Sequence, residues 1–144
     1  MGTTDDLDRV IEENHAALDA FMRGDSGPMK ALYSHADEAT IANPFGPPAR
    51  GWADAAATLD RAAANFRDGR AMAFDRVSEG RTPTMAYIVK IEQVEARIGG
   101  SDAVTPFAVR STTVFLLEDV GWRIVHRHAD PITTPRPPDS VVQR

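Results

Sequence analysis

Helical and strand patterns occupy separate halves of this 144-residue chain. In the first half, apolar residues recur three, four or seven positions apart, which is the spacing of one face of an α-helix. In the second half, apolar and polar residues alternate, as in strands that bury one face. Helices that precede an antiparallel sheet in this way indicate an α+β fold.

Three helices are predicted in the first half. The first carries its apolar stripe over residues 7–22, and the second is short, with Pro28 in its first turn. The third runs from about Trp52 to Phe66 and is expected to end at Asp68-Gly69. Its alanines would let it lie close to a sheet.

A short strand is expected over Asp37–Asn43, followed by the loop Pro44–Pro48, whose prolines interrupt regular structure. Four longer strands should then form a meander, over Ala71–Val77, Met85–Ile98, Val104–Leu117 and Trp122–Asp130. In the strand Met85–Ile98 the apolar phase changes between its first and second halves, which predicts a bulge or a strong bend. A curled sheet with a helix laid across it forms a cone with a pocket inside.

One domain is expected over residues 1–131, followed by a proline-rich tail over residues 132–144. The net charge of −5 and the lack of a basic run disfavour nucleic acid as a partner. The chain has no cysteine, which excludes disulfides, thiol catalysis and Cys-ligated zinc. No segment approaches the roughly 18 apolar residues of a transmembrane helix, and the acidic N-terminus does not resemble a signal peptide. A cytoplasmic protein without a membrane partner is therefore expected.

Ionisable residues gather at the end of the last predicted hairpin. Arg110 lies on its first strand, and strict alternation would place His126, His128 and Asp130 on one face of the second strand together with Trp122. An arginine on an apolar strand face is unfavourable unless it is paired, so Arg110 should either form a salt bridge or orient a ligand oxygen in a pocket. A histidine oriented by a carboxylate can act as a general base.

Other interpretations stay open for several of these residues. His126 and His128 could pack against the sheet of a second subunit instead of facing a pocket. Metal binding is not expected, because alternate residues of one strand rarely converge on an ion. Tyr87 could donate to a substrate oxygen or simply satisfy a backbone carbonyl. Asn43, held extended by the proline that follows it, could place its amide at a cavity mouth.

Five short motifs, in this order, resemble the nuclear transport factor 2-like superfamily. They are Asn43-Pro44-x-Gly46, Gly51-Trp52, Met85-Ala86-Tyr87, Arg110-Ser111-Thr112, and Gly121-Trp122 continuing to His126-Arg127-His128. The most similar branches are SnoaL-like and ketosteroid isomerase-like proteins and the association domain of calcium/calmodulin-dependent kinase. The resemblance covers about residues 5–131 and implies a cystatin-like α+β barrel, a cone-shaped curved antiparallel sheet wrapped around N-terminal helices.

The resemblance also implies where a ligand would bind. Arg110 matches an arginine that points into the pocket of the association domain. Val89 and Ala129 stand near the positions of two further pocket arginines, so this chain lacks that pair, which argues against a strongly anionic ligand. Trp52 is expected in the core or the pocket wall.

The first expected function is a cofactor-independent enzyme that isomerises, cyclises, dehydrates or hydrates a hydrophobic carbonyl compound. Arg110 and Tyr87 would stabilise an enolate, while His128 and Asp130 move the proton. The residues expected to contact the ligand are Asn43, Trp52, Val89 and His126. No cofactor is expected, because phosphate loops and Rossmann fingerprints are missing from the sequence.

The alternative is a non-catalytic module that binds a ligand or mediates association. In either case a homodimer is expected through the convex face of the sheet, because the strands carry apolar residues on both faces and one small domain has a single core to fill.

Overall fold

The computed structural model describes residues 4–143 and places helices on one side of a strongly bent sheet. The helices are α1 (Thr4–Phe21), α2 (Gly27–Leu32), α3 (Trp52–Ala63) and the 3-10 helix η1 (Pro138–Val141). The strands are β1 (Thr40–Ala42), β2 (Ala49–Arg50), β3 (Phe66–Arg81), β4 (Met85–Ile98), β5 (Thr105–Glu118) and β6 (Gly121–Asp130).

The six strands form one sheet in the order β2-β1-β6-β5-β4-β3. Strands β3 to β6 make the expected antiparallel meander. The short strand β1 pairs in parallel with β6, and β2 pairs antiparallel with β1. The α+β class and the curved sheet are thereby confirmed, but the sheet is mixed where we expected antiparallel pairing throughout.

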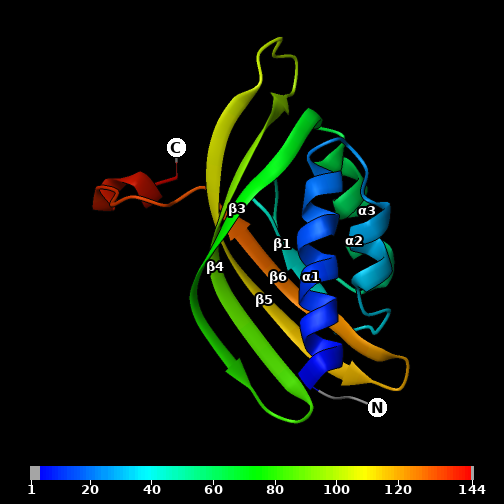
Figure 1. Cartoon of the computed structure of the whole chain (residues 1–144). Coiled ribbons are helices and arrows are strands. Elements are labelled where there is room, and N and C mark those ends of the chain that lie inside the picture. The colour runs from blue at the N-terminus through cyan, green and yellow to red at the C-terminus, as the bar shows by residue number, and fades with distance from the viewer. Residues whose placement is uncertain (1–3, 144) are drawn as a thin grey trace.

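Helix α1 lies along the concave side of the sheet, with α2 and α3 beside it (Figure 1). Its buried stripe, which includes Leu7, Val10, Leu18 and Phe21, packs in the main core with apolar residues of α2, α3 and the inner sheet face. Residues 131–143 leave on the opposite side of the sheet from the helices, and each of them is exposed. No helix within residues 4–143 is both long and apolar enough to cross a membrane.

The sheet bends because β3 carries extra residues relative to β4. The register between these strands shifts at three places, between Arg67 and Arg70, Ala71 and Ala73, and Arg76 and Ser78. Each shift is a β-bulge on β3, which bends the strand and increases its twist.

The pair Asp68-Gly69, which the sequence suggested as a helix end, is the first of these bulges. Asp68 has a φ of 57°. A Cβ added to Gly69 would lie 2.2 Å from the carbonyl oxygen of Glu95, so the neighbouring strand leaves no room for a side chain. Strand β3 therefore begins at Phe66, five residues earlier than predicted from Ala71.

The predicted change of phase in β4 is wrong. Its buried residues alternate without interruption and are Ala86, Ile88, Lys90, Glu92, Val94 and Ala96. The apolar pattern only seemed to shift because Lys90 and Glu92 occupy inward positions in the middle of the strand. These two charged residues therefore lie beneath α1.

A change of phase does occur, but in β6. Val114 pairs with His126 and Phe115 with Ile124, so Val125 is an extra residue. The buried residues are Trp122 and Ile124 before this bulge and Arg127 and Ala129 after it. The expected single face from Trp122 to Asp130 is therefore wrong. Arg127 points into the cone, and the side chains on either side of it point out.

Candidate functional site

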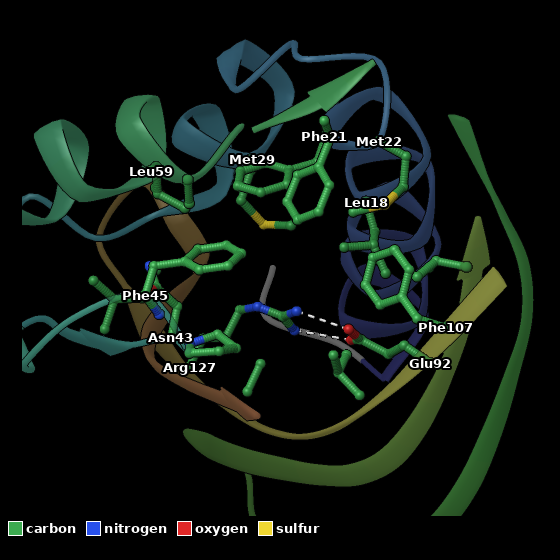
Figure 2. Close-up of a pocket in the computed structure, with 17 residues that line it drawn as sticks. Leu18, Phe21, Met22, Met29, Asn43, Phe45, Leu59, Glu92, Phe107 and Arg127 are labelled. Atoms are coloured by element: carbon green, nitrogen blue, oxygen red, sulfur yellow. Dashed lines mark hydrogen bonds and ion pairs between the residues drawn. The ribbon is translucent and has the colours of Figure 1, made fainter. Parts of the chain in front are cut away.

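A small apolar cavity of about 80 Å³ lies between the helices and the concave face of the sheet (Figure 2). Its wall includes Leu18 and Phe21 of α1, Met29 of α2, Leu59 of α3 and Phe107 of β5. Because a water molecule requires about 10–15 Å³ measured in this way, the cavity has room for several waters or one small organic molecule.

The loop after β1 forms part of the cavity wall. Asn43 and Phe45 both line the cavity, and the Asn43 side-chain oxygen accepts a hydrogen bond from the Phe45 backbone N–H at 2.9 Å. The Phe45 ring lies 5.9 Å from that of Phe66, yet the residue is 54% exposed. Phe45 thus stands between the cavity and solvent.

The polar floor of the cavity is an ion pair between Arg127 of β6 and Glu92 of β4 (Figure 2). Arg127 donates from Nη1 to Oε2 at 2.8 Å and from Nη2 to Oε1 at 2.7 Å, and Ser111 donates to Oε2 at 2.9 Å. Burial opposes ionisation of Glu92, but Arg127 outweighs it and holds the pKa of this carboxyl below its usual value. The floor therefore carries a fixed carboxylate beside a fixed guanidinium.

A second cation, Lys90, lies next to this pair. Its Nζ is 3.8 Å from Glu92 Oε2, donates to Asn14 Oδ1 at 3.2 Å and lies 5.0 Å from the centre of the Phe74 ring. Burial, reinforced by the charge of Arg127, lowers the pKa of Lys90 to about 8, although Glu92 opposes the shift. Two cations therefore share one carboxylate in the interior.

His15 of α1 lies beside this cluster, and its side chain is partly exposed. Its ring stacks on Phe74 with 3.9 Å between the ring centres. Burial and the nearby charge of Lys90 lower the pKa of His15. The imidazole is therefore biased toward its neutral form, which limits the positive charge gathered beneath α1.

A separate cluster lies on the outer face of the sheet. Arg110 Nε donates to Asp130 Oδ1 at 2.7 Å, and His128 Nε2 lies 3.0 Å from Asp130 Oδ2. Burial opposes ionisation of Asp130, but hydrogen bonds from Arg110, the Ile132 backbone and His128 lower its pKa. These three side chains line a shallow depression with Val89.

Comparison with known proteins places the chain in a family. A SnoaL-like domain matches residues 10–133, most of the chain. The chain belongs to the SnoaL-like domain family. No curated protein matches it significantly. One matched structure, from Novosphingobium aromaticivorans, is described as an NTF2-like protein with a cystatin-like fold, which agrees with the bent sheet and its helices.

Three solved structures illustrate this SnoaL-like fold. A candidate dehydratase of the NTF2-like family from Streptomyces avermitilis has 19% identity and a TM-score of 0.72, covering 90% of this chain and 96% of the other. A ketosteroid isomerase-like protein from Erwinia carotovora atroseptica has 18% identity and a TM-score of 0.72, with 92% and 100% coverage. A candidate calcium/calmodulin-dependent protein kinase type II association domain from Thiobacillus denitrificans has 25% identity and a TM-score of 0.63, with 86% and 93% coverage.

The residues predicted as catalytic in this SnoaL-like protein come together, but away from the cavity. Arg110, His128 and Asp130 form the outer-face cluster, and the expectation that Arg110 points into the cone is wrong because its position on β5 faces outward. The alternative that Arg110 forms a salt bridge is confirmed, and its partner is Asp130. Tyr87 is also on the outer face, with its ring packed over Gly80, where an added Cβ would lie 2.3 Å from the ring.

Of the residues predicted to contact a ligand, Asn43 lines the cavity. Val89 and His126 face outward, and His126 Nδ1 lies 2.8 Å from Thr40 Oγ1. Burial and His128 lower the pKa of His126. Trp52 begins α3 and stacks on His35 with 4.1 Å between ring centres. Within residues 4–143, no three His, Asp or Glu side chains are grouped in a way that could hold a metal ion.

The residues of the cavity floor were missed by sequence reasoning. Arg127 was not among the predicted site residues, and the bulge at Val125 that turns it inward leaves no clear mark in the sequence. Lys90 and Glu92 did leave a signal in the sequence. They are charged residues two positions apart, on the same side of the strand as the apolar Ile88 and Val94. Charged residues in an otherwise apolar strand phase are the signal that could have identified this site.

Proposed function

We propose that this SnoaL-like protein is a cofactor-independent enzyme that performs general acid–base chemistry on a small hydrophobic carbonyl compound inside the cone. The observation that carries the proposal is a hydrogen-bonded Arg127–Glu92 pair on the floor of an otherwise apolar cavity. The candidate dehydratase and the ketosteroid isomerase-like protein among the similar structures agree with proton-transfer chemistry of the isomerase or lyase type.

The floor offers the two groups that an enolisation needs. A guanidinium has five N–H donors, and Glu92 takes hydrogen bonds from two of its nitrogens, so N–H groups of Arg127 stay available for a carbonyl oxygen. As a proton leaves the carbon next to the carbonyl, negative charge develops on that oxygen and is stabilised by Arg127. Glu92 is the carboxylate positioned to accept the proton and to return it to another carbon.

The electrostatics of the floor suit this role. The lowered pKa of Glu92 keeps it ionised near neutral pH, as a general base must be. The extra positive charge of Lys90 favours an enolate over the neutral carbonyl compound. The small volume favours substrates of a few carbon atoms, and a larger substrate would require movement of the loop that carries Phe45.

The proposal can be tested by proton exchange, which does not require the natural substrate. Small ketones are incubated with the protein in D₂O, and deuterium incorporation next to the carbonyl is followed by NMR. We expect Glu92→Gln to slow the exchange by about a hundredfold or more, the usual contribution of a general base. Arg110→Ala, which alters only the outer face, should leave the exchange rate unchanged.

Two results would contradict this assignment. Wild-type protein that catalyses no exchange in any of a panel of small ketones would remove the acid–base function. Exchange lost in Arg110→Ala but kept in Glu92→Gln would move the chemistry to the outer cluster of Arg110, His128 and Asp130.

A second candidate function is non-catalytic ligand binding or association. It is favoured by the fact that both carboxylate oxygens of Glu92 already accept hydrogen bonds. Three of the roughly four acceptor sites of the carboxylate are thus occupied, which leaves it less capacity to take a substrate proton. Binding of small ketones without proton exchange would support this alternative.

We also propose a homodimer that packs through the outer face of the sheet. The face exposes Met85 and Tyr87, and beside them lies the Arg110–Asp130 pair. Burial of His126 and His128 between subunits would agree with the interfacial role considered from the sequence.

A further inference from the structure

Lysine is rare in this chain, and one lysine is buried. The chain has 16 Lys and Arg residues, and lysine occurs only at positions 30 and 90. Lys30 is partly exposed and lies 2.9 Å from Asp60, whereas Lys90 is 3% exposed. Arginine keeps its proton in proteins, but lysine can lose it and then becomes a nucleophile. The interior thus holds the basic residue that is capable of covalent chemistry with a carbonyl group.

The surroundings of Lys90 favour its neutral form more than an ordinary salt bridge would. Among the described residues, no carboxylate oxygen lies within hydrogen-bonding distance of Nζ, because Glu92 Oε2 is 3.8 Å away and accepts from Arg127 and Ser111. The hydrogen bond from Nζ goes to the neutral amide of Asn14. With a pKa of about 8, roughly a tenth of Lys90 is neutral at pH 7, about 300-fold more than for an unperturbed lysine.

Lys90 adjoins the cavity through Glu92. Glu92 lines the cavity, and the Lys90 amine is 3.8 Å from its carboxylate. Lys90 does not itself line the cavity, and its Nζ is held by Asn14, Glu92 and the Phe74 ring. The side chain is long and flexible, and rotation away from these contacts would bring Nζ past Glu92 toward the cavity. A small carbonyl compound in contact with Glu92 would then be within its reach.

We propose that Lys90 forms a reversible imine with small aliphatic aldehydes and ketones that enter the cavity. The inference rests on the proposed function in one respect, that a small carbonyl compound binds inside the cone. The Lys90 nitrogen attacks the carbonyl carbon, a C–N bond forms, and the C=O π electrons move to oxygen, which is protonated. The C–O bond then breaks, water leaves, and a C=N bond remains.

The reaction is balanced without an oxidant or a reductant, since one amine and one carbonyl compound give one imine and one water. Glu92 is placed to take the proton that the nitrogen loses and to deliver it to the departing hydroxyl group. The same two side chains that surround a bound carbonyl group would therefore perform nucleophilic attack and proton transfer.

The test is reductive trapping followed by peptide mass mapping. The folded protein is incubated at pH 7 with butanal and sodium cyanoborohydride, which converts an imine into a stable butylamine. We expect Lys90 to be butylated at least about tenfold faster than Lys30, because desolvation activates its amine. In urea that unfolds the protein, the preference should disappear. Butylation at equal rates in the folded protein, or at Lys30 and the N-terminal amine alone, would overturn the inference.

Further variants test which amine forms the imine and whether the aldehyde reaches it through the cavity. Lys90→Arg keeps the positive charge but cannot form an imine, and Lys30→Arg is its matched control; only the first should lose the fast-reacting site. Ala62→Leu fills part of the cavity from α3 and should slow butylation of Lys90 but not of Lys30. An unchanged Lys90 rate in this variant would contradict entry through the cavity.

The outcome separates this inference from the proposed function. Wild-type protein that binds small ketones or exchanges their protons, yet is not trapped at Lys90, overturns imine formation alone. Trapping at Lys90 in a protein that catalyses no proton exchange overturns the acid–base function alone.

Discussion

Two arginine–carboxylate pairs of equal shortest distance lie on opposite faces of the sheet. The shortest nitrogen–oxygen distance is 2.7 Å in both Arg127–Glu92 and Arg110–Asp130. The first is buried and the second has an arginine side chain that is 52% exposed. Water and salt screen the outer pair strongly and the inner pair little, so only the inner pair creates a strong local field. Exposure, more than distance, therefore decides which arginine can stabilise charge on a ligand.

Lys90 should make the stability of the protein depend on pH. Its folded pKa of about 8 lies below the roughly 10.4 of an unfolded lysine, so between these values the unfolded state binds more protons. The free energy of unfolding therefore rises as pH increases through this window, by up to about 3 kcal/mol from this residue. Urea denaturation of wild type and Lys90→Met from pH 7 to pH 10 measures the effect.

The expected result is that wild type gains stability relative to Lys90→Met as pH rises. Groups that titrate in both proteins cancel in the difference. Lys30→Met removes the partly exposed lysine and is the matched control. A constant difference for Lys90→Met would show that the folded and unfolded pKa values of Lys90 are alike.

At the scale of elements, the bulges decide which side chains face the cavity. Most of the helices and strands could be predicted because hydrophobic periodicity extends over many residues. The set of side chains that face the cavity could not be predicted. One extra residue at Val125 reverses the side on which Arg127, His126 and His128 lie. An extra residue of this kind hardly alters the amino-acid composition or the strand propensity of the segment. It is therefore visible only in the pairing of β5 with β6 in the folded structure.

The bulge at Asp68-Gly69 gives a test of this view. Gly69→Ala would place a Cβ against the backbone of Glu95, and backbone cannot move aside as a flexible side chain can. We expect a loss of about 2 kcal/mol or more in the free energy of unfolding, typical of steric strain in a packed region. The matched control is Gly100→Ala, where the added Cβ has nothing within 4 Å and should have a small effect. Equal stability of the two variants, measured in urea, would mean that β3 can shift its register at little cost.

At the scale of the whole molecule, the sequence determined the fold class more firmly than the location of the ligand site. The order of helices and strands restricts a chain of this length to few architectures. The direction in which the sheet bends decides which of its faces is concave. This direction arises from the bulges in β3, which could not be predicted from the sequence. The residues predicted as catalytic therefore lie together on the outer face of the sheet, away from the cavity.

The outer face leads to a last prediction, that the protein is a homodimer in solution. Val89, Val114 and Leu116 are only partly covered there, and Met85 and Tyr87 are exposed. A second copy related by a two-fold axis would bury this apolar surface on both subunits, with the compensated charges of Arg110 and Asp130 brought into the same contact. Light scattering at micromolar concentration should give twice the mass of the chain.

The arrangement of the dimer can be tested with a pair of variants. Val89→Arg adds an unpaired charge at the centre of the outer face and should shift the mass toward the monomer, because a buried charge without a partner is strongly unfavourable. Val120→Arg adds the same charge in the exposed turn between β5 and β6 and should leave the mass unchanged. A monomer mass for wild type would refute the dimer. A dimer mass for both variants would place the interface elsewhere, and the outer cluster would then remain open to solvent and to ligands.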